Sequence, residues 1–132
     1  MTDETSGGFR NRIKNINGVK VIEKSENSVA VEFSIPPDNS YFDGHFPEFS
    51  LLPALAQVEL IIHFASKHLG TGIDISEMRR VKFTQFILPN ALLLLRLEKG
   101  EKNINFKIIS PKDKSLYSSG TLAISHQGGE GK

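Results

Sequence analysis

The stretch between Pro53 and Gly70 constrains the fold more than any other part of this sequence. Its apolar residues cover nearly every side of a helix, at positions 55, 56, 58, 60, 61, 62, 64, 65 and 69. Pro53 suits the first turn of such a helix, and Gly70 suits the position just after its last residue. A helix that is apolar all round has to be covered by other elements. The sequence therefore predicts one long, central, buried helix.

The remainder of the chain reads as strands joined by short, turn-rich links. Apolar and polar residues alternate from 29 to 35 and from 104 to 108, which is the period of a half-buried strand. The segment Leu92 to Leu95 is apolar on both faces, which suits a central strand or one buried at a subunit interface. We expect two extended segments within 19–35 and strands at 80–87, 91–98, 103–110 and 115–125. Short links imply antiparallel neighbours, so the prediction is an α+β domain with a long central helix wrapped by a single antiparallel β-sheet.

Composition narrows the classes of protein to consider. With 39% hydrophobic and 23% charged residues among 132, and no apolar run near the roughly 18 residues of a membrane span, we expect a soluble protein without membrane insertion. Sixteen basic and fifteen acidic side chains leave a charge of +1 without a block of like charges, so nucleic acid is not an expected partner. The absence of cysteine excludes disulfides and thiolate chemistry. The polar N-terminus lacks a secretory signal, which predicts a cytoplasmic location.

The two ends differ in composition from the middle of the chain. Both ends are rich in glycine and polar residues. Such segments bury too little apolar surface to order themselves. We therefore expect a flexible N-terminus at 1–12, a single folded domain at 13–126 and a flexible tail at 127–132.

One carboxylate interrupts the apolar helix. At 100° per residue, Glu59 lies within about 40° of Leu55 and about 60° of Ile62, so its neighbours on the helix are apolar. Desolvation there would raise the pKa of Glu59, which would make it a candidate acid. A structural glutamate, paired with His63 one turn later or reaching solvent, explains the helix pattern equally well.

The histidines differ in how well folding explains them. His45 lies in an irregular loop beside Phe46, where no periodic core face accounts for it, so it is a candidate base. An ordinary surface histidine is the alternative. The other three do not form a convincing metal-ligand set, because two of them diverge by about 140° on the helix and the third is near the C-terminus: His63, His68 and His126.

The start of the helix supplies backbone amides as a third candidate group for catalysis. If Pro53 opens the helix, the amides of Ala54 and Leu55 have no acceptor within it. Amides of this kind can polarise a carbonyl oxygen. A base, an acid and a helix N-terminus together would suit removal of a proton α to a thioester carbonyl and expulsion of a β-leaving group.

The order and spacing of these residues resemble a known family. Residues 44–47 read Gly-His-Phe-Pro, Pro53 follows, and Glu59 lies fourteen positions after His45. This pattern resembles the hot-dog-fold 3-hydroxyacyl-(acyl carrier protein) dehydratases of type II fatty acid synthesis, whose motif has the same spacing. The segment 80–90 is similar to a strand and turn of that family, so the resemblance spans about 13–125.

The resemblance implies a hot-dog fold and a syn elimination of water from a (3R)-3-hydroxyacyl thioester on acyl carrier protein, giving a trans-2-enoyl thioester. It implies that His45 takes the C2 proton, and that Glu59 holds the hydroxyl and protonates it as it leaves. The two residues would come from different subunits of a homodimer, and relatives also form a hexamer as a trimer of dimers. No metal or organic cofactor is needed. An apolar tunnel beside the helix would take the pantetheine arm and acyl chain, with substrate-binding residues Gly44, Phe46, Pro53, Ala54 and Leu55.

Two positions depart from the pattern of the family. Ser50 stands where a proline is usual, and Ala54 replaces the glycine after Pro53. If position 54 needs a positive φ, alanine there adds strain of about 1 kcal/mol or more. The stretch 55–59 also looks similar to a divergent branch associated with specialised acyl or aryl-polyene lipids. Two other functions stay open: a hot-dog acyl thioesterase, and a non-catalytic acyl-binding domain.

Overall fold

The computed structural model describes residues 15–39, 42, 52–70 and 74–125. The ends expected to be flexible, 1–12 and 127–132, lie outside these described residues. The elements are β1 (Asn17–Lys24), β2 (Ser28–Ser34), α2 (Ala54–Leu69), β3 (Asp74–Phe83), β4 (Leu93–Lys99), β5 (Asn103–Ile109) and β6 (Leu116–Ser125). Within the described ranges, no helix has the length and apolar character to cross a membrane.

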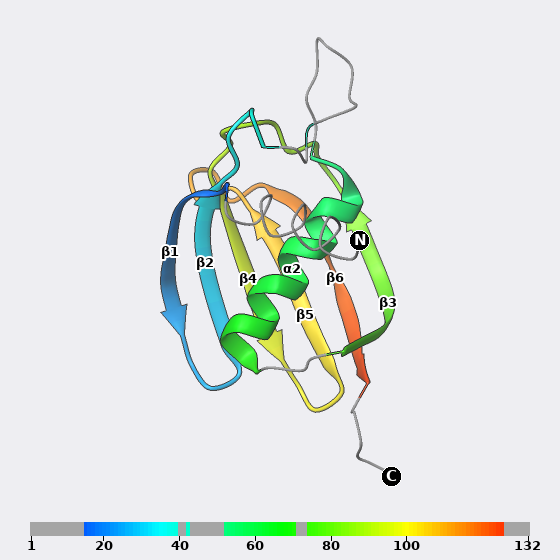
Figure 1. The fold of residues 1–132 in the computed structure, drawn as a ribbon. Coiled ribbons are helices and arrows are strands. Elements are labelled where there is room, and N and C mark those ends of the chain that lie inside the picture. The colour runs from blue at the N-terminus through cyan, green and yellow to red at the C-terminus, as the bar shows by residue number, and fades with distance from the viewer. Residues whose placement is uncertain (1–14, 40–41, 43–51, 71–73, 126–132) are drawn as a thin grey trace, which may run out of the picture.

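The six strands form one sheet, and α2 crosses one of its faces (Figure 1). The strand order is β1-β2-β4-β5-β6-β3, and every neighbouring pair is antiparallel. The predicted α+β architecture, a long helix against a single antiparallel sheet, is confirmed. The leucine-rich strand β4 lies inside the sheet, between β2 and β5, as its apolar character predicts.

The hydrophobic core lies between α2 and the sheet. The ring of Phe64 from the helix and the ring of Phe33 from β2 lie with their centroids 5.2 Å apart. Alternate residues of the inner strands point to the same core, which is why their sequences have a period of two. The fully buried members from β4 and β5 are Leu93, Leu95, Leu97, Ile104 and Ile108.

Most strand boundaries shift by one or two residues from the sequence prediction, and those of β3 shift furthest. We expected a strand at 80–87, but β3 begins at Asp74 and ends at Phe83. Its pairing with β6 extends the strand through a polar stretch that shows no clear alternation, with a register shift between Arg79 and Lys82. Beyond the strand, the chain leaves the sheet, and the carbonyl of Ile87 accepts a hydrogen bond from the Leu52 amide at 2.9 Å. This bond ties the segment after β3 to the residue just before the helix begins.

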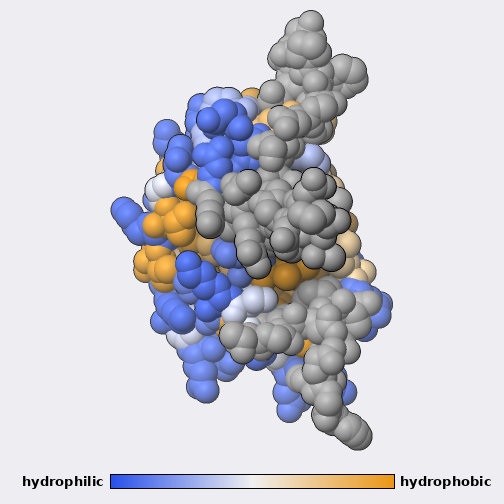
Figure 2. Space-filling view, viewed as in Figure 1, coloured by the Kyte–Doolittle hydropathy of each residue, from blue (hydrophilic) through white to orange (hydrophobic). Residues whose placement is uncertain are grey.

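Among the described residues, the most deeply buried side of α2 is the one that faces the sheet. Residues of α2 that face the sheet are buried, while Val58, Glu59 and Ile62 on the other side are half-buried. The flank formed by β1 is also open, and Figure 2 shows apolar side chains gathered there. Val19, Val21 and Ile22 of β1 are 43% to 47% exposed.

Candidate functional site

The start of α2 presents backbone amides. Pro53 is the N-cap residue, with extended φ and ψ of −65° and 155°, so the helix begins one position later than the sequence suggested. The amide of Gln57 donates to the carbonyl of Pro53 at 3.1 Å, which is the first bond of the helix. The amides of Ala54, Leu55 and Ala56 come before it and have no acceptor within the helix. Among the described residues no side chain caps this end, and its partial positive charge favours an electron-rich group.

Ala54 fits this position without backbone strain. It is the first residue of α2, and its φ is negative. Among the described non-glycine residues, a positive φ occurs only at Arg80, Asn90 and Lys114. Replacement of the usual glycine by alanine therefore keeps the amide and adds no left-handed conformation.

Glu59 lies on the side of α2 that is turned away from the sheet. It is five residues before Phe64, which places the two side chains about 140° apart around the helix. Phe64 is buried against the sheet, whereas Glu59 is half-buried. The sequence suggested that the Glu59 carboxylate is buried among apolar residues, whereas in a single chain the residue is only half-buried. Its surroundings would be completed by whatever covers this side of the helix.

The predicted base and its neighbours lie outside the described residues. These are Gly44, His45 and Phe46. The structure therefore does not test the distance between His45 and Glu59, and the convergence of the two stays a prediction. The residues that flank this segment are anchored, since Phe42 and Leu52 are each 5% exposed and belong to the core.

Gln57 is a polar residue of α2 that sequence reasoning missed. It is 4% exposed and lies within about 20° of Phe64 around the helix, so it faces the sheet. No donor among the described residues reaches its buried Oε1 atom. The hydroxyl of Ser118 on β6 is also buried without a partner in the described part of the chain. A buried oxygen without a donor costs about 1–3 kcal/mol. The period of the helix could have revealed Gln57, because it falls on the line of buried residues.

The two histidines of α2 have lowered pKa values. Burial is the main cause for His63, and the nearby charge of Lys67 adds to it, so the pKa of His63 lies below its ordinary 6.5. The pKa of His68 is also lowered, mainly by burial and then by Lys24 and Lys67. The ring of His68 stacks on Phe64 at 6.2 Å, and its Nε2 has no partner among the described residues. Both rings therefore favour the neutral form and act as packing groups of the helix.

Comparison with known proteins extends this picture. A sequence model of an ApeI-like family, described as ApeI dehydratase, matches residues 21–121. The chain is 24% identical over 115 residues to a 3-hydroxyacyl-(acyl-carrier-protein) dehydratase, FabZ, of Streptococcus sanguinis, covering 80% of this chain and 82% of that protein. The FabZ of Streptococcus mutans gives the same identity and coverage.

Solved structures share the fold. The dehydratase heterocomplex ApeI:P from Xenorhabdus doucetiae has a TM-score of 0.73 at 24% identity, covering 83% of this chain and 99% of the other. An uncharacterised protein from Erwinia carotovora gives 0.65 at 29% identity, with coverage of 83% and 91%. A hypothetical thioesterase with coenzyme A from Streptococcus pneumoniae gives 0.62 at 10% identity, with coverage of 93% and 98%, so this fold also occurs in a protein described as a thioesterase. With the family match spanning most of the sheet and all of α2, the chain belongs to the ApeI-like dehydratases, a hot-dog family related to FabZ.

Proposed function

We propose that this protein removes water from (3R)-3-hydroxyacyl thioesters carried on acyl carrier protein and forms trans-2-enoyl thioesters. The observation that carries the proposal is the start of α2. There, uncapped backbone amides precede Glu59 by one to two turns, in a chain that belongs to a dehydratase family. The spacing of the Gly-His-Phe-Pro segment before this helix supports the same reaction.

Each group has one task in this proposal. The amides of Ala54 and Leu55 donate hydrogen bonds to the thioester oxygen as it gains negative charge, which makes the C2 proton more acidic. His45 takes that proton as general base. Glu59 in its protonated form donates to the C3 hydroxyl, which leaves as water. The proton taken by His45 then returns through solvent, and Glu59 regains its own, so the enzyme is unchanged after one turnover.

A second subunit belongs to the proposal. Glu59 lies on the half-buried side of α2, and this supports a site that another chain completes. A homodimer is the simplest arrangement, and a hexamer built from such dimers is compatible with it. The solved ApeI:P complex is a dehydratase heterocomplex, which supports a different subunit as the alternative partner. A cytoplasmic location, expected from the sequence, stays a prediction.

The test is a coupled assay with a 3-hydroxyacyl and a trans-2-enoyl carrier protein, read by mass spectrometry. Wild type should interconvert the two, and His45→Ala and Glu59→Gln should each abolish this, while Glu26→Gln in the exposed turn between β1 and β2 should not. Thermal melting of each variant shows whether it folds. Release of a free acid by wild type would instead identify a thioesterase. Retention of the acyl group without any reaction would identify an acyl-binding domain.

A further inference from the structure

The face of the sheet that points away from α2 carries two lysines on either side of a small hydroxyl residue. In the hydrogen-bonded register, Ser119 of β6 lies directly opposite Lys107 of β5 and Lys82 of β3. Lys107 lies between the buried residues Phe106 and Ile108 along its strand, so it points away from the core, together with its neighbours across the sheet. This row is therefore on the face opposite to the candidate active site.

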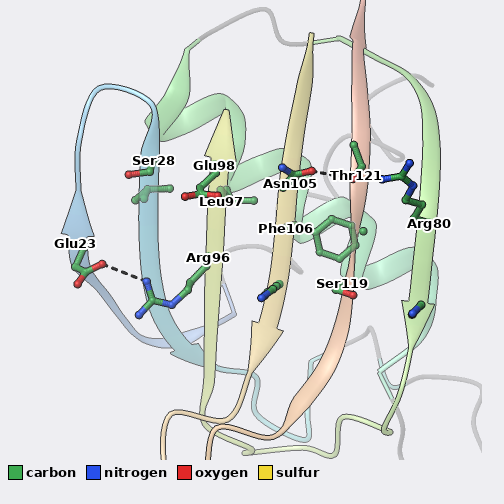
Figure 3. Close-up of a pocket in the computed structure, with 14 residues that line it drawn as sticks. Glu23, Ser28, Arg80, Arg96, Leu97, Glu98, Asn105, Phe106, Ser119 and Thr121 are labelled. Atoms are coloured by element: carbon green, nitrogen blue, oxygen red, sulfur yellow. Dashed lines mark hydrogen bonds and ion pairs between the residues drawn. The ribbon is translucent and has the colours of Figure 1, made fainter. Parts of the chain in front are cut away.

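The next outward row of the same three strands adds further hydrogen-bond donors. Thr121 of β6 lies opposite Asn105 of β5 and Arg79 of β3. The Thr121 hydroxyl donates to Oδ1 of Asn105 at 2.8 Å, and the N–H groups of the Asn105 side chain have no partner among the described residues. Arg80 extends from β3 toward Thr121 (Figure 3). The two rows together place donors around residues 119–121 of β6.

A groove of about 790 Å³ lies over both rows (Figure 3). Small residues at 119–121 of β6 form its floor at this end, and longer side chains of β5 and β3 stand on either side. Neighbouring strands lie about 4.8 Å apart, so the β5 and β3 backbones are separated by about 10 Å, and Ser119 and Thr121 by about 7 Å along β6. The space between the two flanking strands suits a compact ligand and not an extended polymer.

The cations at this end of the groove are not neutralised within the described chain. None of the ion pairs formed among the described residues includes Arg80, Lys82 or Lys107, and all three residues are exposed. Lys107 also lies directly opposite Arg96 of β4, and like charges in that arrangement destabilise a sheet. Arg96 has a partner, since its Nη1 atom lies 3.2 Å from Oε1 of Glu23. An external anion would offset the repulsion among the remaining cations.

Arg80 has a backbone conformation that few side chains adopt. Its φ is 55°, and it lies at the extra residue of the register shift between Arg79 and Lys82. Glycine is the common residue where a bulge needs this left-handed conformation. Here the bulge brings a third cation into the groove beside Lys82. Retention of an arginine in this conformation is typical of a backbone that positions a binding group.

We propose that this cluster binds the diphosphate group of a small molecule. The diphosphate site consists of three cations and three polar residues of β5, β6 and β3: Arg80, Lys82, Asn105, Lys107, Ser119 and Thr121. A single phosphoryl group carries a charge of about −2, so three neighbouring cations match two linked phosphoryl groups better than one. Glu23 and Glu98 line the β1 to β4 end of the groove and would repel a uniformly negative nucleic acid backbone.

This inference goes beyond the proposed function and does not depend on it. The diphosphate site lies on the opposite face of the sheet from α2, so its ligand is not the thioester. Binding can therefore be measured without any substrate, and a failure of the dehydratase assay would leave the result unaffected.

The experiment is calorimetric titration with inorganic pyrophosphate at constant ionic strength. It compares wild type with Lys82→Gln and Lys107→Gln, and the control is Lys112→Gln, on an exposed lysine between β5 and β6 outside the groove. Wild type and the control should bind with the same Kd, and each groove variant should raise Kd about tenfold, because it removes one charged donor. Lys107→Arg keeps the charge and should retain binding. Thermal melting without pyrophosphate shows whether each variant is folded.

Backbone amide NMR then locates the bound anion. Shifts at 80–82 and 119–121 that saturate with the calorimetric Kd support the diphosphate site. The uncapped start of α2 is a competing anion site, so shifts confined to 54–56 would overturn the proposal. Absence of saturable binding, or equal Kd values for wild type and both groove variants, would overturn it as well. If inorganic phosphate binds as tightly as pyrophosphate, the assignment to a diphosphate is wrong.

Discussion

Replacement of Gly120 by alanine tests the packing between the sheet strands and the core. Gly120 of β6 lies opposite Phe106 of β5, on the helix side of the sheet. A Cβ atom built there would lie 2.8 Å from Cε2 of Phe106 and 3.0 Å from Cγ2 of Val81. Phe106 is 2% exposed, so its ring is packed among other residues. Gly120 is therefore required by close packing, and not by a positive φ.

The magnitude follows from two opposing terms. Insertion of a methyl group into a filled core costs about 1–3 kcal/mol. Alanine also lowers the conformational entropy of the unfolded chain, which stabilises the folded state by about 0.4–1 kcal/mol. We expect Gly120→Ala to lower the free energy of unfolding by about 1–2 kcal/mol, and to lower Tm by roughly 4–8 °C for a domain of this size.

Urea denaturation and thermal melting measure this effect. Gly100→Ala is the matched control, because a Cβ there would have its nearest contact 3.7 Å away, at the carbonyl of Asn103, and it should be neutral or slightly stabilising. Adding Phe106→Leu to Gly120→Ala should cost less than the sum of the two single changes, since the smaller side chain makes room. A Gly120→Ala protein that melts at or above the wild-type temperature would refute the packing argument.

Three further predictions concern α2. Gln57→Leu should raise the free energy of unfolding by about 1–2 kcal/mol, because it removes a buried oxygen without a donor; a fall in the urea midpoint would instead reveal a partner for the amide. The pKa of His63 and of His68 is lowered from 6.5, so the unfolded chain takes up protons first as the pH falls. The contribution of these histidines to stability should therefore be complete above about pH 7 and decline below about pH 6.5. The urea midpoint should fall over this range in wild type and depend less on pH in the variant with both His63→Gln and His68→Gln. Ala54→Gly should keep turnover, because the amide remains, and cost less than about 1 kcal/mol by the same denaturation; a clear rise in turnover would mean that alanine hinders the site.

The sequence predicted the elements of this fold well where the period was strong. The inner strands β2 and β5 follow from residues such as Phe33 and Ile108, which repeat with their neighbours at the expected spacing. Strand β4 follows from its run of leucines, which is apolar on both faces. The beginning of β3 at Asp74 was missed, because its pairing with β6 and not its own pattern makes it a strand. Local propensity cannot report a partner as distant in the sequence as Ser125, which pairs with Asp74.

The candidate site was predictable only in part. The uncapped amides at Ala54 follow from the proline before them, and the predicted start of the helix was wrong by one position. The half-buried state of Glu59 depends on which side of the helix the sheet covers, and an all-round apolar pattern does not contain that information.

The position of β3 at the edge of the sheet also affects how the chain is made. A ribosome releases α2 and β3 well before β6, yet β6 is the strand that holds β3 in the sheet. During synthesis β3 therefore waits without its hydrogen-bonding partner, with Met78 and Phe83, which are still about half exposed in the finished chain, unprotected. Closure of the sheet depends on contacts between distant parts of the chain, which makes folding slow and sensitive to aggregation. A chain cut short after β5 would keep most of its core residues and still lack the strand that secures β3.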